Sequence, residues 1–237
     1  MYLQFSPRFE AVAVKPDEGK ALQSAAKKTA KRDPENAKRT LVLATLDTIA
    51  EIGITDTTVS KIIERAELSR GMIHLHFGGK NPLLEAAARA FSEEYYYEVD
   101  RRIKLTGNDP EAVIMAIIDA DLSEALMNQR STRIWHAFRG IASSNSGIAV
   151  YSNTRDKRLR DLVRTAFENL AEQYENQDRF ILARDATFGL LVLLEGMWVD
   201  YLSNSAEFSR EVATSIVRRF IAGLFPHHFQ DAQRLSS

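Results

Sequence analysis

From residue 34 onward, apolar side chains recur every three or four positions, and this spacing continues through most of the chain. It is typical of α-helices that each bury one face. A clear example is the run of apolar residues at Val113, Ile114, Ile117, Ile118, Leu122 and Leu126. No two segments alternate as a pair of strands would, so the sequence predicts an all-α fold.

Proline, glycine and hydroxyl residues predict where the helices begin and end. Pro34 suits the first turn of a helix and Gly53 its stop. Thr57 or Thr58 is the predicted N-cap of a short second helix, and Ser69 the N-cap of a third. The third is expected to end at 77–79, and later helices to begin near 81–82 and 110 and to span about 131–142, 148–176, 178–202 and 207–224.

The composition is that of an ordinary folded protein and excludes several chemistries. The chain has 237 residues, of which 45% are hydrophobic, and a formal net charge of −1. It has no cysteine, which excludes disulfides, thiolate nucleophiles and thiol-bound zinc or iron–sulfur clusters. No apolar run reaches 18 residues and the N-terminus lacks the pattern of a secretory signal, so we expect a cytoplasmic protein without a membrane span.

The small net charge conceals an uneven distribution. Residues 1–80 hold 13 Lys and Arg against 10 Asp and Glu, whereas residues 81–237 hold 18 against 22. The excess of positive charge is greatest in residues 20–39. This pattern suits a basic arm that leads into a nucleic-acid-binding unit, although a solvated tail with no partner has the same composition.

The most informative motif is a pair of short helices joined by a tight turn. In a helix-turn-helix, the second helix enters the DNA major groove. Many all-α proteins contain a similar helix pair, so only the identity of the residues can distinguish a DNA-binding pair from the others. The stretch TVSKIIERAELSRGMIHLHFGGKNPLL, residues 58–84, has a threonine that opens the second helix, a Ser-x-Gly turn, Phe77 and then Lys-x-x-Leu-Leu. Over residues 36–84 the chain resembles the DNA-binding domain of the TetR family of bacterial repressors.

Three positions depart from the pattern of that family. Ile63 and Glu67 stand where alanine and glycine are usual, and His74 stands where tyrosine is common. These departures concern the DNA sequence that is read rather than the fold.

Ser69, the predicted N-cap of the third helix, is an expected DNA-binding residue, and three others are expected to position the helix pair on DNA without reading its sequence. Thr58 lies at a helix N-terminus, where its hydroxyl and backbone N–H can bind phosphate. Lys80 adds a cation and His76 a ring N–H donor.

Three residues of the third helix are expected to face base edges. Arg70 suits a bidentate contact to guanine, and Met72 suits contact with a thymine methyl group, while His74 lies on the same presumed side. Met72 can instead fill a gap in the core, and the other two can simply be solvated surface residues.

The C-terminal part resembles the BetI group within this family at residues 134–138 and 194–198. If the resemblance extends to the ligand, it implies a cationic effector similar to choline. The expected ligand-binding residues are four aromatic side chains and one carboxylate: Trp135, Phe138, Trp198, Tyr201 and Glu195. The alternatives are that the tryptophans are plain core and that Glu195 pairs with a nearby arginine.

The last two predicted helices have apolar faces that suit a dimer interface built as a four-helix bundle. Their apolar residues are Phe188, Leu191, Leu194, Trp198 and Leu202 on one helix and Val212, Ile216, Phe220 and Leu224 on the other. The same faces can also be core of the monomer. A homodimer would present two recognition helices to a palindromic operator, and an effector would act by favouring a conformer that spaces them wrongly.

The sequence gives no support for an enzyme. It has no phosphate-binding loop, no Gly-x-Ser-x-Gly and no paired metal-ligand motif, so we expect no catalytic residues, cofactor or metal. The competing hypothesis is an all-helical dimeric adaptor or ligand-binding protein that reads no DNA sequence. The predicted organisation is a disordered basic extension (1–33), a three-helix DNA-binding domain (34–80), an effector-binding and dimerisation domain (81–225) and a tail (226–237).

Overall fold

The computed structural model describes residues 33–107, 109–152, 157–172 and 178–229, and all regular secondary structure in these ranges is helical. This confirms the all-α prediction. The predicted basic extension therefore lies outside the described residues, apart from Asp33. The helices are α2 (Pro34–Asp56), α3 (Val59–Ala66), α4 (Arg70–Phe77), α5 (Lys80–Ile103), α6 (Pro110–Asp121), α7 (Gln129–Ala142), α8 (Ser146–Ser152), α9 (Lys157–Ala171), α10 (Asp178–Asn204) and α11 (Arg210–Leu224).

The predicted stop of the first helix at Gly53 is a kink, and the helix continues to Asp56. Asp33 caps the N-terminus of α2 by accepting a hydrogen bond from the backbone N–H of Glu35 at 3.0 Å. Gly53 leaves the helical conformation with φ 78°, so α2 is interrupted there before a last turn. Thr57 donates its hydroxyl to the Gly53 carbonyl at 2.7 Å, and Thr58, rather than Thr57, is the N-cap of α3.

Two predicted boundaries in the second half are wrong. The expected single helix over 148–176 is two helices, α8 and α9, with residues 153–156 outside the described ranges. Helix α6 ends at Asp121, before Leu126, because a new helix starts soon after it. Asn128 is the N-cap of that helix, α7, and accepts the Ser131 backbone N–H at 2.9 Å.

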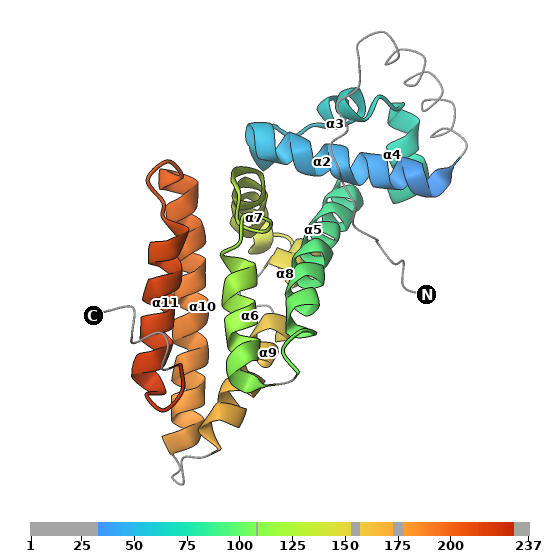
Figure 1. The fold of residues 1–237 in the computed structure, drawn as a ribbon. Coiled ribbons are helices and arrows are strands. Elements are labelled where there is room, and N and C mark those ends of the chain that lie inside the picture. The colour runs from blue at the N-terminus through green and yellow to red at the C-terminus, as the bar shows by residue number, and fades with distance from the viewer. Residues whose placement is uncertain (1–32, 108, 153–156, 173–177, 230–237) are drawn as a thin grey trace.

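Two hydrophobic cores organise the molecule. One is formed by α2, α3, α4 and the first half of α5, and residues of α7 and α8 also contribute to it. The other is formed by the second half of α5 with α6, α9, α10 and α11. In Figure 1, α2–α4 lie together at one end, while α10 and α11 run side by side along the opposite edge. Since α5 contributes to both cores, the predicted boundary at residue 80 falls at the start of a shared helix.

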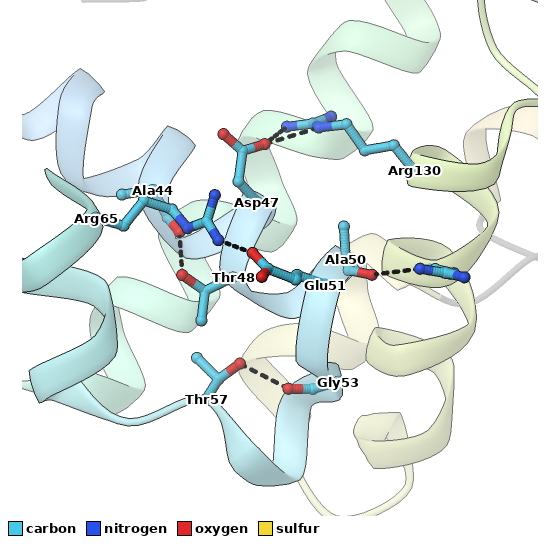
Figure 2. A network of polar contacts seen from close by, with 10 residues as sticks. Ala44, Asp47, Thr48, Ala50, Glu51, Gly53, Thr57, Arg65 and Arg130 are labelled. Carbon is cyan, nitrogen blue, oxygen red and sulfur yellow. Dashed lines mark hydrogen bonds and ion pairs between the residues drawn. The ribbon is translucent and has the colours of Figure 1, made fainter.

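Helix α7 is joined to α2 by polar contacts as well as by the shared core (Figure 2). Arg130 forms an ion pair with Asp47 at 2.7 Å, and Arg133 donates to the Ala50 carbonyl at 3.4 Å. The α7 residues Ile134 and Phe138 are buried in the core that α2 shares. A displacement of α7 would therefore change its contacts with α2 directly.

The outer pair of helices carries a band of exposed apolar residues, which are Phe180, Ile181, Phe188, Val192 and Val199 on α10 and Val212 and Ile216 on α11. Leu191, Leu194 and Trp198, which the sequence assigned to an interface, are buried inside the monomer instead. No helix within the described ranges is long and apolar enough to span a membrane.

Candidate DNA interface and ligand cavity

Helices α3 and α4 form the predicted helix-turn-helix. Ile62 of α3 and Ile73 of α4 are fully buried and hold both helices against the first core. Between the helices, Glu67 adopts the left-handed conformation with φ 52° and ψ 34°. This lets the Leu68 N–H reach the Ile63 carbonyl at 3.2 Å and closes the turn.

The two helix N-termini differ in their capping. Thr58 accepts the Lys61 backbone N–H at 3.3 Å, which confirms it as an N-cap. Ser69 occupies the predicted N-cap position of α4, but its side chain makes no capping hydrogen bond, so that part of the prediction is wrong. Both residues are exposed at the start of their helices.

Two of the three predicted base-contacting residues are exposed. The Arg70 guanidinium donates through Nη2 to the hydroxyl of Ser60 on α3 at 2.9 Å, and this bond orients the Arg70 side chain toward α3. His74 is exposed one turn further along α4. Met72 is half-buried and packs against the first core, which agrees with the alternative that it fills a gap there.

Of the two predicted phosphate-binding residues near the end of α4, one is partly exposed and the other has a buried ring nitrogen. Lys80 is the first residue of α5 and is partly exposed. His76 is half-buried, and its Nε2 atom is buried with no hydrogen-bond partner among the residues that the structure describes. That atom does not reach the surface, so a phosphate contact from His76 would have to use Nδ1. Gly78 ends α4 with φ 79°, as the glycine pair predicted.

A cavity of about 80 Å³ lies among helices α5 to α10. This is several times the roughly 10–15 Å³ that one water molecule needs, so the cavity has room for a small organic molecule. Its lining comes from α5 to α10 and consists of Ala88, Phe91, Ser92, Tyr95, Tyr96, Asp121, Trp135, Phe138, Tyr151, Leu159, Leu191, Leu194, Glu195 and Trp198. Four of the five predicted ligand-binding residues therefore line one cavity.

Asp121, which the sequence analysis did not identify, is the most unusual residue of the lining. Its side chain is buried, and it accepts hydrogen bonds from the Tyr95 hydroxyl at 2.8 Å and from Trp198 Nε1 at 2.9 Å. Within the described ranges it forms no ion pair. Burial raises the pKa of Asp121 to about 6, although the two hydrogen bonds oppose this rise. At neutral pH the cavity therefore holds a buried carboxylate that is mostly ionised.

Aromatic rings surround this carboxylate. The ring centroids of Trp135 and Trp198 are 5.6 Å apart, and those of Tyr95 and Tyr96 are 5.3 Å apart at an interplanar angle of 88°. The negative face of an aromatic ring attracts cations, most strongly in tryptophan. The lining thus places a buried carboxylate beside several π faces.

Glu195 lines the same cavity but already has a partner. It forms an ion pair with Arg139 of α7, whose guanidinium also lies 5.3 Å from the Trp135 ring centroid. The alternative that Glu195 pairs with a nearby arginine is therefore confirmed. Asp121, not Glu195, is the cavity carboxylate that forms no ion pair with any residue that the structure describes.

Tyr201 does not line the cavity. Its ring packs edge-to-face against Phe208 at 5.3 Å, and the Arg210 guanidinium lies 5.2 Å from its centroid. Arg210 also donates to the carbonyls of Leu122 and Met127 at 2.7 and 2.6 Å. The first of these bonds holds the C-cap residue of α6, directly after Asp121, and the second holds the connection to α7.

No group of three His, Asp or Glu side chains in the described part of the chain is arranged to hold a metal ion. The features that the structure does have, a helix-turn-helix at one end and a cavity lined by aromatic side chains in the helical remainder, define a class of protein: a transcriptional regulator controlled by a small molecule.

Comparisons with known proteins identify the family. Residues 41–87 match the model for bacterial regulatory proteins of the tetR family, and residues 110–226 match the BetI-type transcriptional repressor C-terminal model. The chain is 31% identical to the HTH-type transcriptional regulator BetI of Stenotrophomonas maltophilia (strain R551-3) over 76% of this chain and 89% of that protein. It is 28% identical to BetI of Cronobacter sakazakii over 82% and 95%. The chain belongs to the TetR family and is a helix-turn-helix transcriptional repressor of the ligand-responsive, BetI-type kind.

Solved structures have the same fold. A transcriptional regulator from Pseudomonas aeruginosa PAO1 superposes with a TM-score of 0.72 at 25% identity, over 84% of this chain and 95% of that one. A regulator from Saccharomonospora viridis, crystallised in complex with choline, superposes with a TM-score of 0.65 at 19% identity, over 79% and 96%.

Proposed function

We propose that this protein is a homodimeric repressor that binds a palindromic operator and releases it when a small organic cation, similar to choline, enters the cavity. The observation that carries the proposal is Asp121, a buried carboxylate with no ion-pair partner in the described structure, set among aromatic rings. In this proposal the protein catalyses no reaction. It binds its operator DNA in the cytoplasm.

A cation would complete the electrostatics of this site. An ionised carboxylate is costly to bury, and the two hydrogen bonds from Tyr95 and Trp198 offset only part of that cost. A quaternary ammonium group donates no hydrogen bonds and needs only a negative charge and π faces. Trp135 and Trp198, together with Phe138 and the neighbouring tyrosines, supply those faces. Choline is the first probe to use because the related fold from Saccharomonospora viridis was crystallised with it.

We propose that the exposed apolar band on α10 and α11 is the dimer interface. Residues such as Phe188, Val192 and Val212 are exposed in the monomer although they are large and apolar. Two copies of the helix pair would bury this band as a four-helix bundle. The two recognition helices would then meet half-sites one DNA turn apart, about 34–36 Å.

On the operator, Thr58, Ser69 and Lys80 are proposed to bind phosphates, and Arg70 and His74 to contact base edges. The exposure of Thr58, Ser69, Arg70 and His74 supports these roles, as does the partly exposed position of Lys80 at the start of α5. We expect Arg70→Ala to weaken specific binding by about 1–3 kcal/mol, and Lys80→Ala to weaken all DNA binding and reduce its dependence on salt.

Helix α7 supports a route by which the ligand could act on DNA binding. One part of α7 lines the cavity through Trp135 and Phe138, while Arg130 binds Asp47 on α2. A ligand that shifts α7 would favour a conformer in which α2 and the helix-turn-helix are displaced. It releases DNA only to the extent that it binds that conformer more tightly.

The test is a mobility-shift titration with DNA from the protein's own promoter region, with choline chloride or an equal concentration of sodium chloride. The sodium chloride control matters because salt alone weakens protein–DNA complexes. We expect specific retardation that choline abolishes and sodium chloride leaves largely intact. Equal release by the two salts would contradict the proposed effector, and no specific retardation would contradict the operator.

A further inference from the structure

We propose that Leu75 is a base-reading residue of the recognition helix and that it contacts a thymine methyl group in the operator. This inference rests on the proposed operator binding. It replaces Met72, which the sequence analysis assigned to that contact.

The orientation of α4 follows from its buried anchor. Ile73 is 1% exposed and points into the first core. Successive residues of an α-helix are rotated by about 100°, so Leu75 and Gly71 lie about 160° from Ile73 on either side, nearly opposite to it. Met72 is rotated by only about 100° and packs partly against the core. Leu75, not Met72, is thus the apolar side chain on the outermost line of the helix.

The exposure of Leu75 agrees with this geometry. Its exposed fraction is 73%, whereas Ile73 two residues earlier is buried. A single exposed leucine carries little information on most surfaces. Here it lies on the outward face of the helix that a helix-turn-helix inserts into the major groove, where thymine presents its only apolar group, the C5 methyl.

The neighbours of Leu75 suit close approach to DNA. Gly71, one turn earlier on the same line, has only the Ser69 Oγ atom near the position of a Cβ, at 3.9 Å, so the helix surface is bare there. Arg70 and His74 are also exposed on α4 and add polar groups for base edges and phosphates. An α-helix with its side chains is about 10–12 Å across, which fits the roughly 12 Å width of the major groove.

The experiment removes the methyl group from the DNA rather than only the side chain from the protein. Sequences bound by the wild-type dimer are selected from random DNA, and each thymine of the selected site is replaced in turn by deoxyuridine, which lacks only the C5 methyl. For the wild-type protein we expect one thymine per half-site whose replacement weakens binding about fourfold, as expected for one methyl group buried against a side chain. For Leu75→Ala the same replacement should change affinity by less than about 1.5-fold.

Met72→Ala is the matched control, because it shortens a neighbouring apolar side chain that faces the core. It should lower thermal stability but keep the wild-type response to every deoxyuridine. The inference is overturned if Leu75→Ala retains that response, or if no deoxyuridine weakens wild-type binding. Failure of the wild-type protein to enrich any sequence would instead contradict the proposed operator binding.

Discussion

Arg139 on α7 forms an ion pair with Glu195 on α10 at the edge of the cavity, and its guanidinium lies 5.3 Å from the Trp135 ring centroid. The protein's own cation thus pairs with the Glu195 carboxylate and lies over one face of Trp135, both of which the sequence assigned to a ligand. Asp121 has no such partner among the described residues, and this difference assigns different roles to the two carboxylates.

The ion pair and Asp121 can be separated by mutation. The double substitution Arg139→Gln with Glu195→Gln removes both charges of the pair, so it should change choline affinity by less than about threefold. Asp121→Asn keeps the shape of the side chain but removes its charge. It should weaken choline binding by at least about 2 kcal/mol, because the ammonium group would then be buried without a counter-ion.

Fluorescence can follow this binding, because the two tryptophans of the chain, Trp135 and Trp198, both line the cavity. Circular dichroism on both variants checks that they remain folded. Equal loss of affinity in the double variant and in Asp121→Asn would contradict the division of roles.

Choline affinity should depend on pH through Asp121. Its pKa is raised to about 6 by burial, so a proton competes with the cation as the pH falls through that value. Affinity should be constant above about pH 7 and about tenfold lower at pH 5. The same titration of Asp121→Asn should be nearly flat. A pH dependence that survives in this variant would assign the effect to another group.

The raised pKa also predicts the sign of a stability effect. The pKa of Asp121 is higher in the native state than in the unfolded state, so protonation of Asp121 stabilises the native state. This contribution is complete below the unfolded-state pKa of about 3.8 and is lost as the pH rises through about 6. Asp121→Asn should therefore show a smaller loss of thermal stability than the wild type between pH 4 and pH 7. An identical loss in both proteins would contradict ionisation of Asp121 in this range.

The turn of the helix-turn-helix should be stabilised by glycine. Glu67 adopts φ 52°, a conformation that costs a residue with a Cβ roughly 1 kcal/mol. Glu67→Gly should therefore raise the free energy of unfolding by up to about 1 kcal/mol, measured by urea denaturation. Glu64→Gly, on the exposed surface of α3, is the matched control and should lower it by about 1 kcal/mol. A decrease in both variants would show that Glu67 is held by contacts stronger than its strain.

The dimer interface can be tested with charges. Val192→Asp and Val212→Asp place a carboxylate in the exposed band of α10 and α11, and each should convert a dimer to a monomer in sedimentation equilibrium. Leu105→Asp changes a leucine that is 81% exposed elsewhere and should leave the dimer intact. A wild-type protein that is monomeric at micromolar concentration would contradict the proposed interface.

Periodicity is sufficient to predict most of the helices, because buried anchors such as Ile62 and Ile73 stand at helical spacing next to caps and glycines. The helix-turn-helix also needs the motif of residues 58–84 and its resemblance to a family. The cavity was only partly predictable. Trp135 and Trp198 were found through their resemblance to a family, whereas Asp121 looks in the sequence like an ordinary polar residue at a helix end. Its role depends on packing α6 against α5 and α10, which brings Tyr95 and Trp198 to it.

The most direct test of the account compares choline with 3,3-dimethylbutan-1-ol, a neutral molecule of nearly the same shape, by isothermal titration calorimetry. If the cavity recognises positive charge through Asp121, the wild-type protein binds choline at least about 30-fold more tightly than the neutral alcohol, and Asp121→Asn loses most of this preference. Equal affinity of the wild-type protein for the two molecules would contradict a cation site at Asp121.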